Sequence, residues 1–492
     1  MAVQCQQFIG GQWLSATGKR VSDRDPSYVN QEIAYFYEAT PDDVRHAIQV
    51  AYDAYLDWRE VPAPQRGRVL LKAHQILSER REELALIMMR EQGKTLAEAR
   101  GEIQKGLNLL EFFAGEGFRL SGETTPSEIP HNFTYTVRQP LGVVAAITPW
   151  NFPFAIPVWK LAPALVAGNA VVFKPASWTP LMSTAIVKGF VDAGLPAGVL
   201  NMVLGSGPVV GQAIALDPLT KAVSFTGSNA VGASLQQQLA GRPIKLTMEM
   251  GGKNAVVVMP DADLAVAAEG VVGGAFGCAG QRCTATSRVL VHRAIRQQFE
   301  AACLARIEQI EVGPPDAANV TMGPVIDEHQ LTQGLAMVEQ AVAEGAVVLA
   351  GGHRLRDGAR ADGVFMAPTV LSEVRPEMAV ARDEIFGPVL AMMSFDTLDA
   401  AIAIVNGVEY GLTASIYTQD IKTAQRFIER VEVGMVHVNN PTIGGEAQLP
   451  FGGIKSSGLG PREMAHEGTL FFTETKTVFL DYSGTRRTGN LY

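Results

Sequence analysis

The chain has 492 residues, a net charge of −9, 47% hydrophobic and 18% charged residues. This length predicts two or three domains, each with enough apolar residues for its own core. The acidic balance and the scattered lysines and arginines argue against a nucleic-acid partner.

Cysteine usage and apolar runs indicate where the protein works. The chain has four cysteines, Cys5, Cys278, Cys283 and Cys303. They are too few for a disulfide scaffold, and the first residues show no basic segment followed by an apolar run, so we expect a cytoplasmic protein. The longest apolar stretches are shorter than the ~20 residues of a spanning helix, so no membrane partner is expected.

The first part of the chain predicts helices followed by a hairpin. Thr40 can cap a helix that has Pro41 in its first turn and apolar residues at helical spacing up to Tyr55. More helix is expected from Leu70 to Gly93. Prolines and then alternating residues between Thr124 and Pro140 predict an exposed hairpin outside the main core, of the kind that often serves oligomer contacts.

From Gly142 onward, short apolar strands alternate with helical stretches. The predicted strands are at 142–148, 169–175, 199–205, 222–227 and 245–250. This alternation predicts an α/β fold with a parallel sheet covered by helices, and ligands at the carboxyl ends of the strands. A second region of the same kind runs from near Asn254 to Thr442.

The stretch "FGCAGQRCTAT" holds two cysteines, Cys278 and Cys283. A helical segment precedes it, and Gly280 to Arg282 predict a loop that places Cys283 near backbone amides, where a nucleophilic thiolate is favoured. The alternative is that both cysteines are small core residues. A metal site is not expected, because there is no CxxC motif and no histidine close by in the sequence.

Two strand ends carry candidate catalytic groups. Asn151 in "TPWNFPF" could direct its amide at an oxyanion, or could simply form a turn. Glu249 in "LTMEMGGKN" could have a raised pKa among apolar neighbours and act as a general base, or could be a solvent-facing glutamate.

Further strand ends suggest a nucleotide site. Gly227 and Ser228 in "FTGSNAVG" stand between a strand and a helix, where backbone amides can hold a phosphate. Lys174 ends another strand and could reach a ribose or phosphate. The glycines of "LGSGPVVG" depart by one residue from the GxGxxG spacing, so that match is weak.

Seven strings occur together: "TPWNFP", "FKPASWTP", "FTGS", "EMGGKN", "GQRC", "EIFGPV" and "PFGGIKSSG". In order and approximate spacing the chain resembles the aldehyde dehydrogenase superfamily, from "FIGGQW" nearly to its C-terminus. The resemblance implies that Cys283 is the nucleophile, Glu249 the general base, Asn151 an oxyanion donor and Lys160 the catalytic-site lysine. Cys278 matches no family role, and we interpret it as a packing residue.

The resemblance also implies a nicotinamide dinucleotide cofactor. The matching positions are Trp150, Lys174, Gly227, Ser228, Glu384 and Phe386. Ser177 stands where strict NAD users often carry a glutamate that repels a 2′-phosphate, so we expect NADP to be accepted at least as well as NAD.

The residues suffice for NAD(P)-dependent oxidation of an aldehyde to a carboxylic acid through a cysteine thioester. The presence of Glu249 favours hydrolysis of that thioester over transfer to CoA. Two alternatives stay open: a catalytically silent member of the same fold, and a thiol hydrolase without cofactor, which the absence of a nearby histidine signature disfavours.

The substrate stays open between two classes. Trp159 occupies the position of an arginine that grips carboxylates in part of the family, and with Phe152 and Phe451 it suggests an apolar or aromatic wall. However, "GQRCTATSRV" and "PVWKLAPAL" resemble the branch of 2-oxoglutarate semialdehyde (2,5-dioxopentanoate) dehydrogenases. Glu446 could lie near the mouth of the site and disfavour anions, or be a solvated loop residue.

The family fold implies three parts. They are a Rossmann-like cofactor domain at 1–121 and 141–251, an α/β catalytic domain at 252–456, and a small β oligomerisation arm at 122–140 and 472–492. The resemblance therefore also implies a homodimer or homotetramer.

Overall fold

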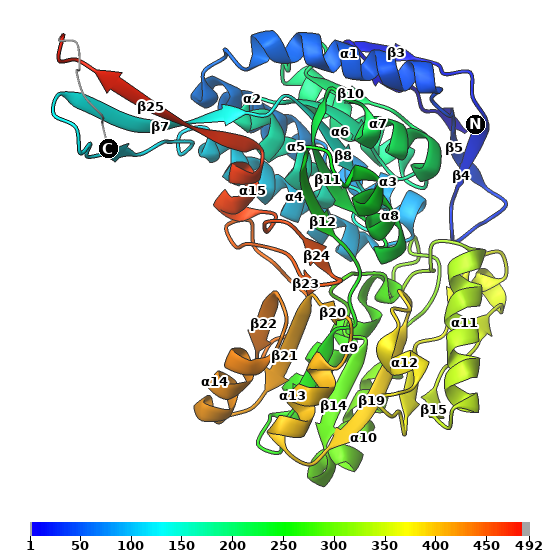
Figure 1. Cartoon of the computed structure of the whole chain (residues 1–492). Helices are drawn as coiled ribbons and strands as arrows, with labels where there is room; N and C mark the ends of the chain where they lie inside the picture. Colours follow the sequence, from blue (N-terminus) through cyan, green and yellow to red (C-terminus); the bar gives the residue numbers. More distant parts are fainter. Residues whose placement is uncertain (1, 485–492) are drawn as a thin grey trace.

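The computed structural model describes residues 2–484, and its two large sheets lie in separate lobes (Figure 1). Within the described residues, the larger sheet has eight strands. Its order is β24 (Gly458–Leu459), β12 (Lys245–Glu249), β11 (Thr220–Thr226), β8 (Val143–Ile147), β9 (Ala170–Lys174), β10 (Leu200–Met202), β2 (Gln7–Ile9) and β3 (Gln12–Leu14). The five strands from β12 to β10 are parallel, as the sequence predicts.

The antiparallel edges of this sheet were not predicted. β2 pairs with β10 at one edge, and β24 pairs with β12 at the other. Because β24 comes from near the end of the chain, this pairing brings residues after 450 against the strand that carries Glu249.

Side chains of the central strands point alternately to the two faces of the sheet, and each face has its own apolar core. Val144 and Ala146 of β8 belong to one core, whereas Val143 and Ala145 belong to the other. Successive side chains of a strand point to opposite faces, so a strand apolar on both sides must be covered twice. One core is completed by α2 (Ala63–Glu79), α3 (Arg81–Gln92), α4 (Leu96–Glu116), α5 (Ala155–Ala167) and α6 (Pro180–Asp192), the other by α1 (Pro41–Trp58), α7 (Gln212–Leu216) and α8 (Asn229–Leu239).

The start of α1 follows from local chemistry. Thr40 caps the helix by accepting a hydrogen bond from the Asp43 backbone N–H, and the Asp43 carboxylate accepts one from the Thr40 N–H in return. The prediction of this helix and of its buried apolar face is confirmed.

The second lobe contains a seven-stranded sheet with its own core. The order is β15 (Val347–Ala350), β18 (Thr369–Ser372), β19 (Val389–Phe395), β14 (Arg288–His292), β13 (Ala255–Val258), β21 (Thr413–Tyr417) and β22 (Met435–Val438). Its helices are α9 (Leu264–Phe276), α10 (Arg296–Ile307), α11 (Glu328–Ala343), α12 (Ala379–Arg382), α13 (Leu398–Asn406) and α14 (Ile421–Arg430). With both lobes built from strands and helices, the α/β prediction is confirmed.

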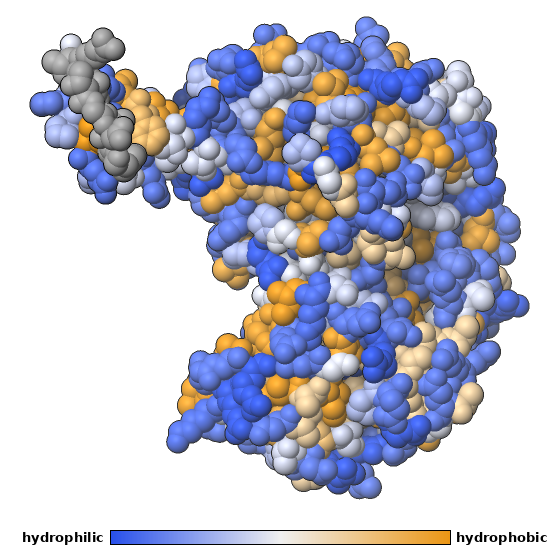
Figure 2. Space-filling view, in the orientation of Figure 1, coloured by the Kyte–Doolittle hydropathy of each residue, from blue (hydrophilic) through white to orange (hydrophobic). Residues whose placement is uncertain are grey.

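A three-stranded arm projects from the first lobe (Figures 1 and 2). β6 (Thr124–Thr125) and β7 (Asn132–Pro140) form the predicted hairpin, and β25 (Thr473–Asp481), which follows α15 (Ala465–Phe471), pairs with the whole of β7. The predicted arm segment extends to residue 492, and its part from 485 onward lies outside the described residues.

Small sheets complete the fold. They are β1 (Val3–Gln4), β5 (Glu32–Tyr37) and β4 (Arg20–Arg24), the pair β16 (Arg354–Leu355) and β17 (Phe365–Met366), and the pair β20 (Tyr410–Gly411) and β23 (Ile454–Lys455). Over residues 2–484, the helices are too short or too polar to cross a bilayer.

Candidate active site

Cys283 lies on a loop that the preceding backbone forces into an unusual path. After α9, Cys278, Ala279 and Gly280 have φ values of 54°, 52° and 70°, which end the helix and turn the chain. The Asn254 side-chain amide then donates to the carbonyl oxygens of Cys283 and Ala285, at 2.7 and 2.9 Å. The loop predicted here is confirmed, and Asn254 fixes it from the neighbouring segment.

Cys278 behaves as the predicted packing residue. It is buried, and its Sγ accepts a hydrogen bond from Arg282 Nη2 at 3.1 Å. Burial, followed by the charge of Glu98, raises the pKa of the Cys278 thiol to about 11.

The charges around Cys283 oppose ionisation. Burial, followed by the charges of Glu384 and Glu249, raises the pKa of its thiol to about 12, with Lys105 and the Thr284 backbone amide opposing that shift. This shift runs against the expectation of a thiolate at this loop, because burial and then the charges of Glu384 and Glu249 disfavour the ionised sulfur.

Asn151 is brought against the same loop. Its Nδ2 donates to the Gln281 carbonyl at 3.1 Å, and its side chain is buried. The Asn151 carbonyl accepts a hydrogen bond from Lys94 Nζ at 2.6 Å, and Lys94 forms a buried ion pair with Glu102. The Glu102 carboxylate also accepts hydrogen bonds from the backbone N–H groups of Phe154 and Ala155, at 2.9 and 3.1 Å. A buried ion pair thus fixes the loop that carries Asn151.

The close approach of α4 to this loop requires a glycine. A Cβ at Gly106 would stand 2.4 Å from the Phe154 ring. Any larger residue would push the helix away from the loop and weaken the hydrogen bonds of Lys94 and Glu102 that hold the loop.

Glu249 is buried at the end of β12, with 2% of its surface exposed, so the solvent-facing alternative is wrong. Burial and then the nearby Glu463 raise the pKa of Glu249 well above its ordinary value, which confirms the prediction of a raised pKa. Its Oε2 accepts a hydrogen bond from the Gly453 N–H at 3.1 Å. At Gly452 φ is 151°, and a Cβ there would stand 2.2 Å from Glu249 Oε1, so only glycine fits beside this carboxylate.

Lys160 and Glu463 form a buried pair behind Glu249. The Lys160 ammonium contacts the Glu463 carboxylate and donates to Ser224 Oγ at 2.9 Å. Burial lowers the pKa of Lys160, and Glu463 and Glu249 oppose that shift. Sequence reasoning found Lys160 only through the family resemblance and missed Glu463, which no local pattern marks.

The predicted cofactor residues fall into two groups. Trp150 and Phe386 meet edge to face with ring centroids 5.6 Å apart, and Glu384 Oε1 accepts a hydrogen bond from the Gly252 N–H at 3.1 Å. Burial raises the pKa of Glu384 to about 7.

The second group lies at the carboxyl ends of β9 and β11. Burial lowers the pKa of Lys174 to about 8, opposed by the charge of Glu38, a carboxylate that the sequence did not reveal. Ser177 Oγ donates to the Gly205 carbonyl at 3.3 Å, so the "KPAS" and "LGSG" loops are adjacent.

Two residues of this group join β11 to α8. Gly227 donates its N–H to the Glu249 carbonyl at 3.1 Å, and Ser228 caps α8. A buried ammonium, a serine hydroxyl and a helix N-terminus form a donor set that fits a dinucleotide phosphate and ribose.

The predicted aromatic wall is only partly as expected. Trp159 and Phe451 have ring centroids 5.3 Å apart, but the Lys105 ammonium lies 5.3 Å from the Trp159 ring centre and 5.8 Å from that of Phe451. Phe152 packs instead under Lys94, whose Nζ is 4.0 Å from its ring centre. Lys105 of α4 therefore adds a cation beside the Trp159 and Phe451 rings, and the role of these rings as a substrate wall stays a prediction.

A groove of about 620 Å³ lies beside α4, between that helix and the loop 445–448. Lys105 and Glu446 both line it, and Glu446 is exposed and hydrogen-bonded to Gln448. The interpretation of Glu446 as a solvated loop residue is thus confirmed, whereas its place at the mouth of the site stays a prediction.

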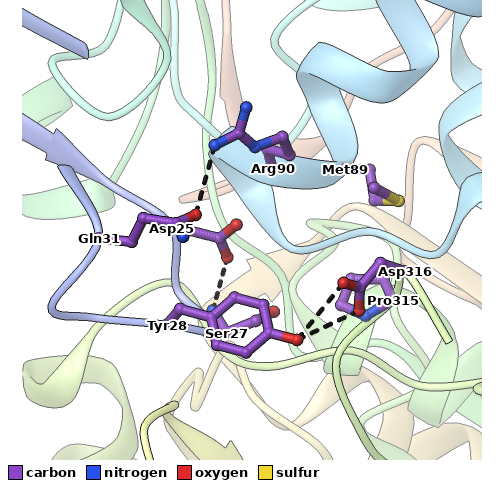
Figure 3. A pocket seen from close by; sticks show the side chains of 8 residues that line it. All are labelled: Asp25, Ser27, Tyr28, Gln31, Met89, Arg90, Pro315 and Asp316. Carbon is purple, nitrogen blue, oxygen red and sulfur yellow. Dashed lines mark hydrogen bonds between the residues drawn. The ribbon is translucent and has the colours of Figure 1, made fainter. Parts of the chain in front are cut away.

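A separate hollow of about 340 Å³ contains none of the predicted site residues (Figure 3). In it the Asp25 carboxylate accepts a hydrogen bond from the Ser27 N–H at 2.9 Å, and the Tyr28 hydroxyl lies 3.4 Å from the Asp316 carboxylate. We assign it no part in the chemistry at Cys283.

Known proteins match this chain over nearly its whole length. Residues 13–478 match the model of the aldehyde dehydrogenase family. The alpha-ketoglutaric semialdehyde dehydrogenase of Bacillus subtilis (strain 168) is 44% identical, over 96% of this chain and 97% of that protein. The 2,5-dioxopentanoate dehydrogenase of Saccharolobus solfataricus is 43% identical, over 96% and 98%.

Solved structures agree with these matches. The betaine aldehyde dehydrogenase of Staphylococcus aureus in complex with NAD+ has a TM-score of 0.96 at 32% identity, covering 100% of this chain and 97% of that one. A 3,6-anhydro-L-galactose dehydrogenase in complex with NADP has a TM-score of 0.94 at 35% identity, covering 97% and 100%.

Proposed function

Because this chain belongs to the aldehyde dehydrogenase family and is an NAD(P)-dependent enzyme of that family, we propose that its substrate is 2-oxoglutarate semialdehyde. One observation carries the proposal: two relatives at 44% and 43% identity, each matched over nearly its full length, are both named for this compound under its two chemical names. The product would be the corresponding dicarboxylic acid.

In this proposal the Cys283 thiol loses its proton to solvent water, and its sulfur attacks the aldehyde carbon, so that a C–S bond forms as the C=O π bond opens to an oxyanion. The Asn151 amide and a backbone N–H beside Cys283 stabilise the oxyanion that results. Asn151 is suited to this because Lys94 and Glu102 hold its backbone in place. A nicotinamide held by Trp150, Glu384 and Phe386 would supply the hydride acceptor for this oxidation, which leaves the carbon as a thioester on Cys283.

Glu249 then takes a proton from the water that cleaves the thioester, which releases the carboxylic acid and restores the Cys283 thiol. Its raised pKa suits a base that must accept a proton near neutral pH. The Lys160 ammonium lowers the pKa of Glu249 and so opposes the effects of burial and of Glu463.

For the cofactor, we propose that NADP is accepted at least as well as NAD. Trp150, Glu384 and Phe386 would hold the nicotinamide end, and Lys174, Ser177, Gly227 and Ser228 the adenosine and phosphate end. Ser177 offers a hydroxyl where a glutamate would repel a 2′-phosphate. Glu38 works against this preference, because its charge offsets that of Lys174.

The remaining predictions stay proposals of the same kind. We place the cofactor domain at 1–121 and 141–251, the catalytic domain at 252–456 and the oligomerisation arm at 122–140 and 472–492. Exposed apolar side chains on the arm, among them Phe133, Phe479 and Leu480, support a contact with a second copy in a homodimer or homotetramer. We also propose a cytoplasmic location, since the four cysteines are free.

Steady-state formation of NADH or NADPH with a panel of aldehydes tests the substrate. The panel is 2,5-dioxopentanoate, succinic semialdehyde, pentanal and benzaldehyde. We expect kcat/KM for 2,5-dioxopentanoate to exceed the others by about tenfold or more. A lead for pentanal or benzaldehyde would support the apolar alternative, and no reduction with any aldehyde would indicate a silent member of the fold.

A further inference from the structure

Among the residues that line the groove beside α4, Lys105 is the one cation. The two acidic residues of the lining do not pair with it. Glu111 and Glu446 line the groove but are exposed, whereas Lys105 is half-buried and lies against the Trp159 and Phe451 rings. A Cβ on Gly445 would stand 3.5 Å from Lys105 Nζ, so the loop backbone closes over the ammonium group. The charge is therefore held at the inner part of the groove.

Lys105 has no protein counter-ion. Across residues 2–484, no carboxylate reaches ion-pair distance of its Nζ, and no hydrogen bond from it is present. Burial lowers its pKa, and the charges of Cys283 and Glu102 oppose that shift. Removing an ammonium from water without a partner is costly, and the two aromatic faces offset only part of that cost.

Lys105 and Cys283 are also close enough for the charge of each to shift the pKa of the other. The Lys105 ammonium lowers the pKa of the Cys283 thiol, and the thiol raises that of Lys105. In extended 2,5-dioxopentanoate the carboxylate carbon lies four C–C bonds from the aldehyde carbon, which is about 5 Å because each bond of ~1.5 Å advances only about 1.25 Å along the chain axis. An aldehyde carbon at the sulfur would thus carry its carboxylate into the region around Cys283.

We propose that Lys105 is the residue that binds the substrate carboxylate, an inference that rests on the proposed function. It would supply from α4 the cation that the Trp159 position lacks, with the Trp159 and Phe451 rings flanking the methylene chain. The unpaired ammonium gains its counter-ion only when the substrate binds, so substrates with a carboxylate are favoured over neutral aldehydes of equal length.

The test compares two substrates on the same enzyme preparation. Lys105→Met removes the charge at similar length, Lys105→Arg retains it, and Lys188→Met makes the same chemical change on the exposed face of α6. The readout is the ratio of kcat/KM for 2,5-dioxopentanoate to that for pentanal. We expect Lys105→Met to lower this ratio by about 30-fold, mainly through KM, Lys105→Arg to restore most of it and Lys188→Met to leave it unchanged.

Each other outcome has a distinct meaning. If Lys105 acts only by assisting Cys283, Lys105→Met will slow both substrates alike and leave the ratio unchanged, which overturns the inference alone. If the wild-type enzyme does not favour 2,5-dioxopentanoate over pentanal, the proposed substrate is wrong. In that case, inhibition of pentanal oxidation by glutarate still measures carboxylate binding. Equal inhibition of the wild type and of Lys105→Met would overturn the proposed role of Lys105, whatever the substrate is.

Discussion

Groups of opposite charge act on the pKa of the Cys283 thiol. On one side, Glu249 and Glu384 raise the pKa of its thiol, and on the other Lys105 lowers it. The acidic side prevails together with burial, and the pKa reaches about 12. The acids belong to loops that we assign to hydrolysis and cofactor binding, and the cation to the groove that we assign to the substrate.

The excess of acidic over basic influence on the thiol shows how such a site can protect a cysteine from side reactions. A thiol that stays protonated reacts slowly with oxidants and alkylating agents, because the thiolate is the nucleophile. Neutralising or displacing a carboxyl group near the sulfur would raise the thiolate fraction. If the proposed cofactor contacts Glu384, it would act on one such carboxyl group and would thereby link cofactor binding to the reactivity of Cys283.

The largest expected effect comes from removing the sulfur on which both sides act. Cys283→Ala should lower NAD(P)H formation by about 10⁴-fold or more, since no other group at the site can form the thioester. Steady-state assays with 2,5-dioxopentanoate measure it. Cofactor binding, followed by quenching of tryptophan fluorescence, should persist. Substantial turnover in this variant would remove Cys283 from the mechanism.

On the acidic side, Glu249→Gln should separate the two chemical steps. Steady turnover should fall by about 100-fold or more, because the base for hydrolysis is lost. Rapid mixing should still show up to about one equivalent of reduced cofactor per site, since loss of this charge also lowers the pKa of Cys283. Sustained turnover at the wild-type rate would show that another group activates the water.

At the adenosine end, an added carboxylate should affect cofactor choice alone. Ser177→Glu should lower kcat/KM for NADP by about tenfold or more, because a carboxylate near a phosphate is repelled. The ratio between 2,5-dioxopentanoate and pentanal should not change. If the wild type scarcely uses NADP, or if the substitution leaves the NADP/NAD ratio unchanged, this loop does not contact the 2′ position.

The smallest expected effect tests the balance of charge directly. In the enzyme without cofactor, Glu384→Gln should speed alkylation of Cys283 by iodoacetamide near neutral pH, on the order of 3-fold or more, because a lower pKa raises the thiolate fraction. Lys105→Met should slow it. Glu446→Gln, on the exposed loop, serves as the control. The same rate in all three variants would show that these charges do not govern the thiol.

Local signals determined much of the fold. The Thr40 cap and the helical spacing after it predicted α1, and alternating apolar strands predicted the parallel part of the large sheet. Helix caps and the spacing of apolar residues depend only on residues close together in the sequence, so they can be recognised from one sequence. The antiparallel strand β24 was missed because a two-residue strand has no pattern of its own.

For the site, the sequence patterns marked Cys283, Asn151 and Glu249 as candidates on one loop and at two strand ends, each beside a structural alternative. Family resemblance then gave Cys283, Glu249, Asn151 and Lys160 their expected roles. A usable signal for Lys105 and Glu102 also existed, since both interrupt the apolar spacing of α4, but a charged residue on a helix is usually solvated.

Only the tertiary structure decided the charges that each group meets. Glu463 reaches Lys160 from a distant segment, Lys105 reaches the Trp159 ring from another helix, and Glu384 faces the loop of Cys283 from the second lobe. A pKa depends on burial and on charges within a few ångströms, whatever their separation along the chain. For that reason the sequence could name Cys283 as the nucleophile, whereas its protonated state follows from the folded molecule.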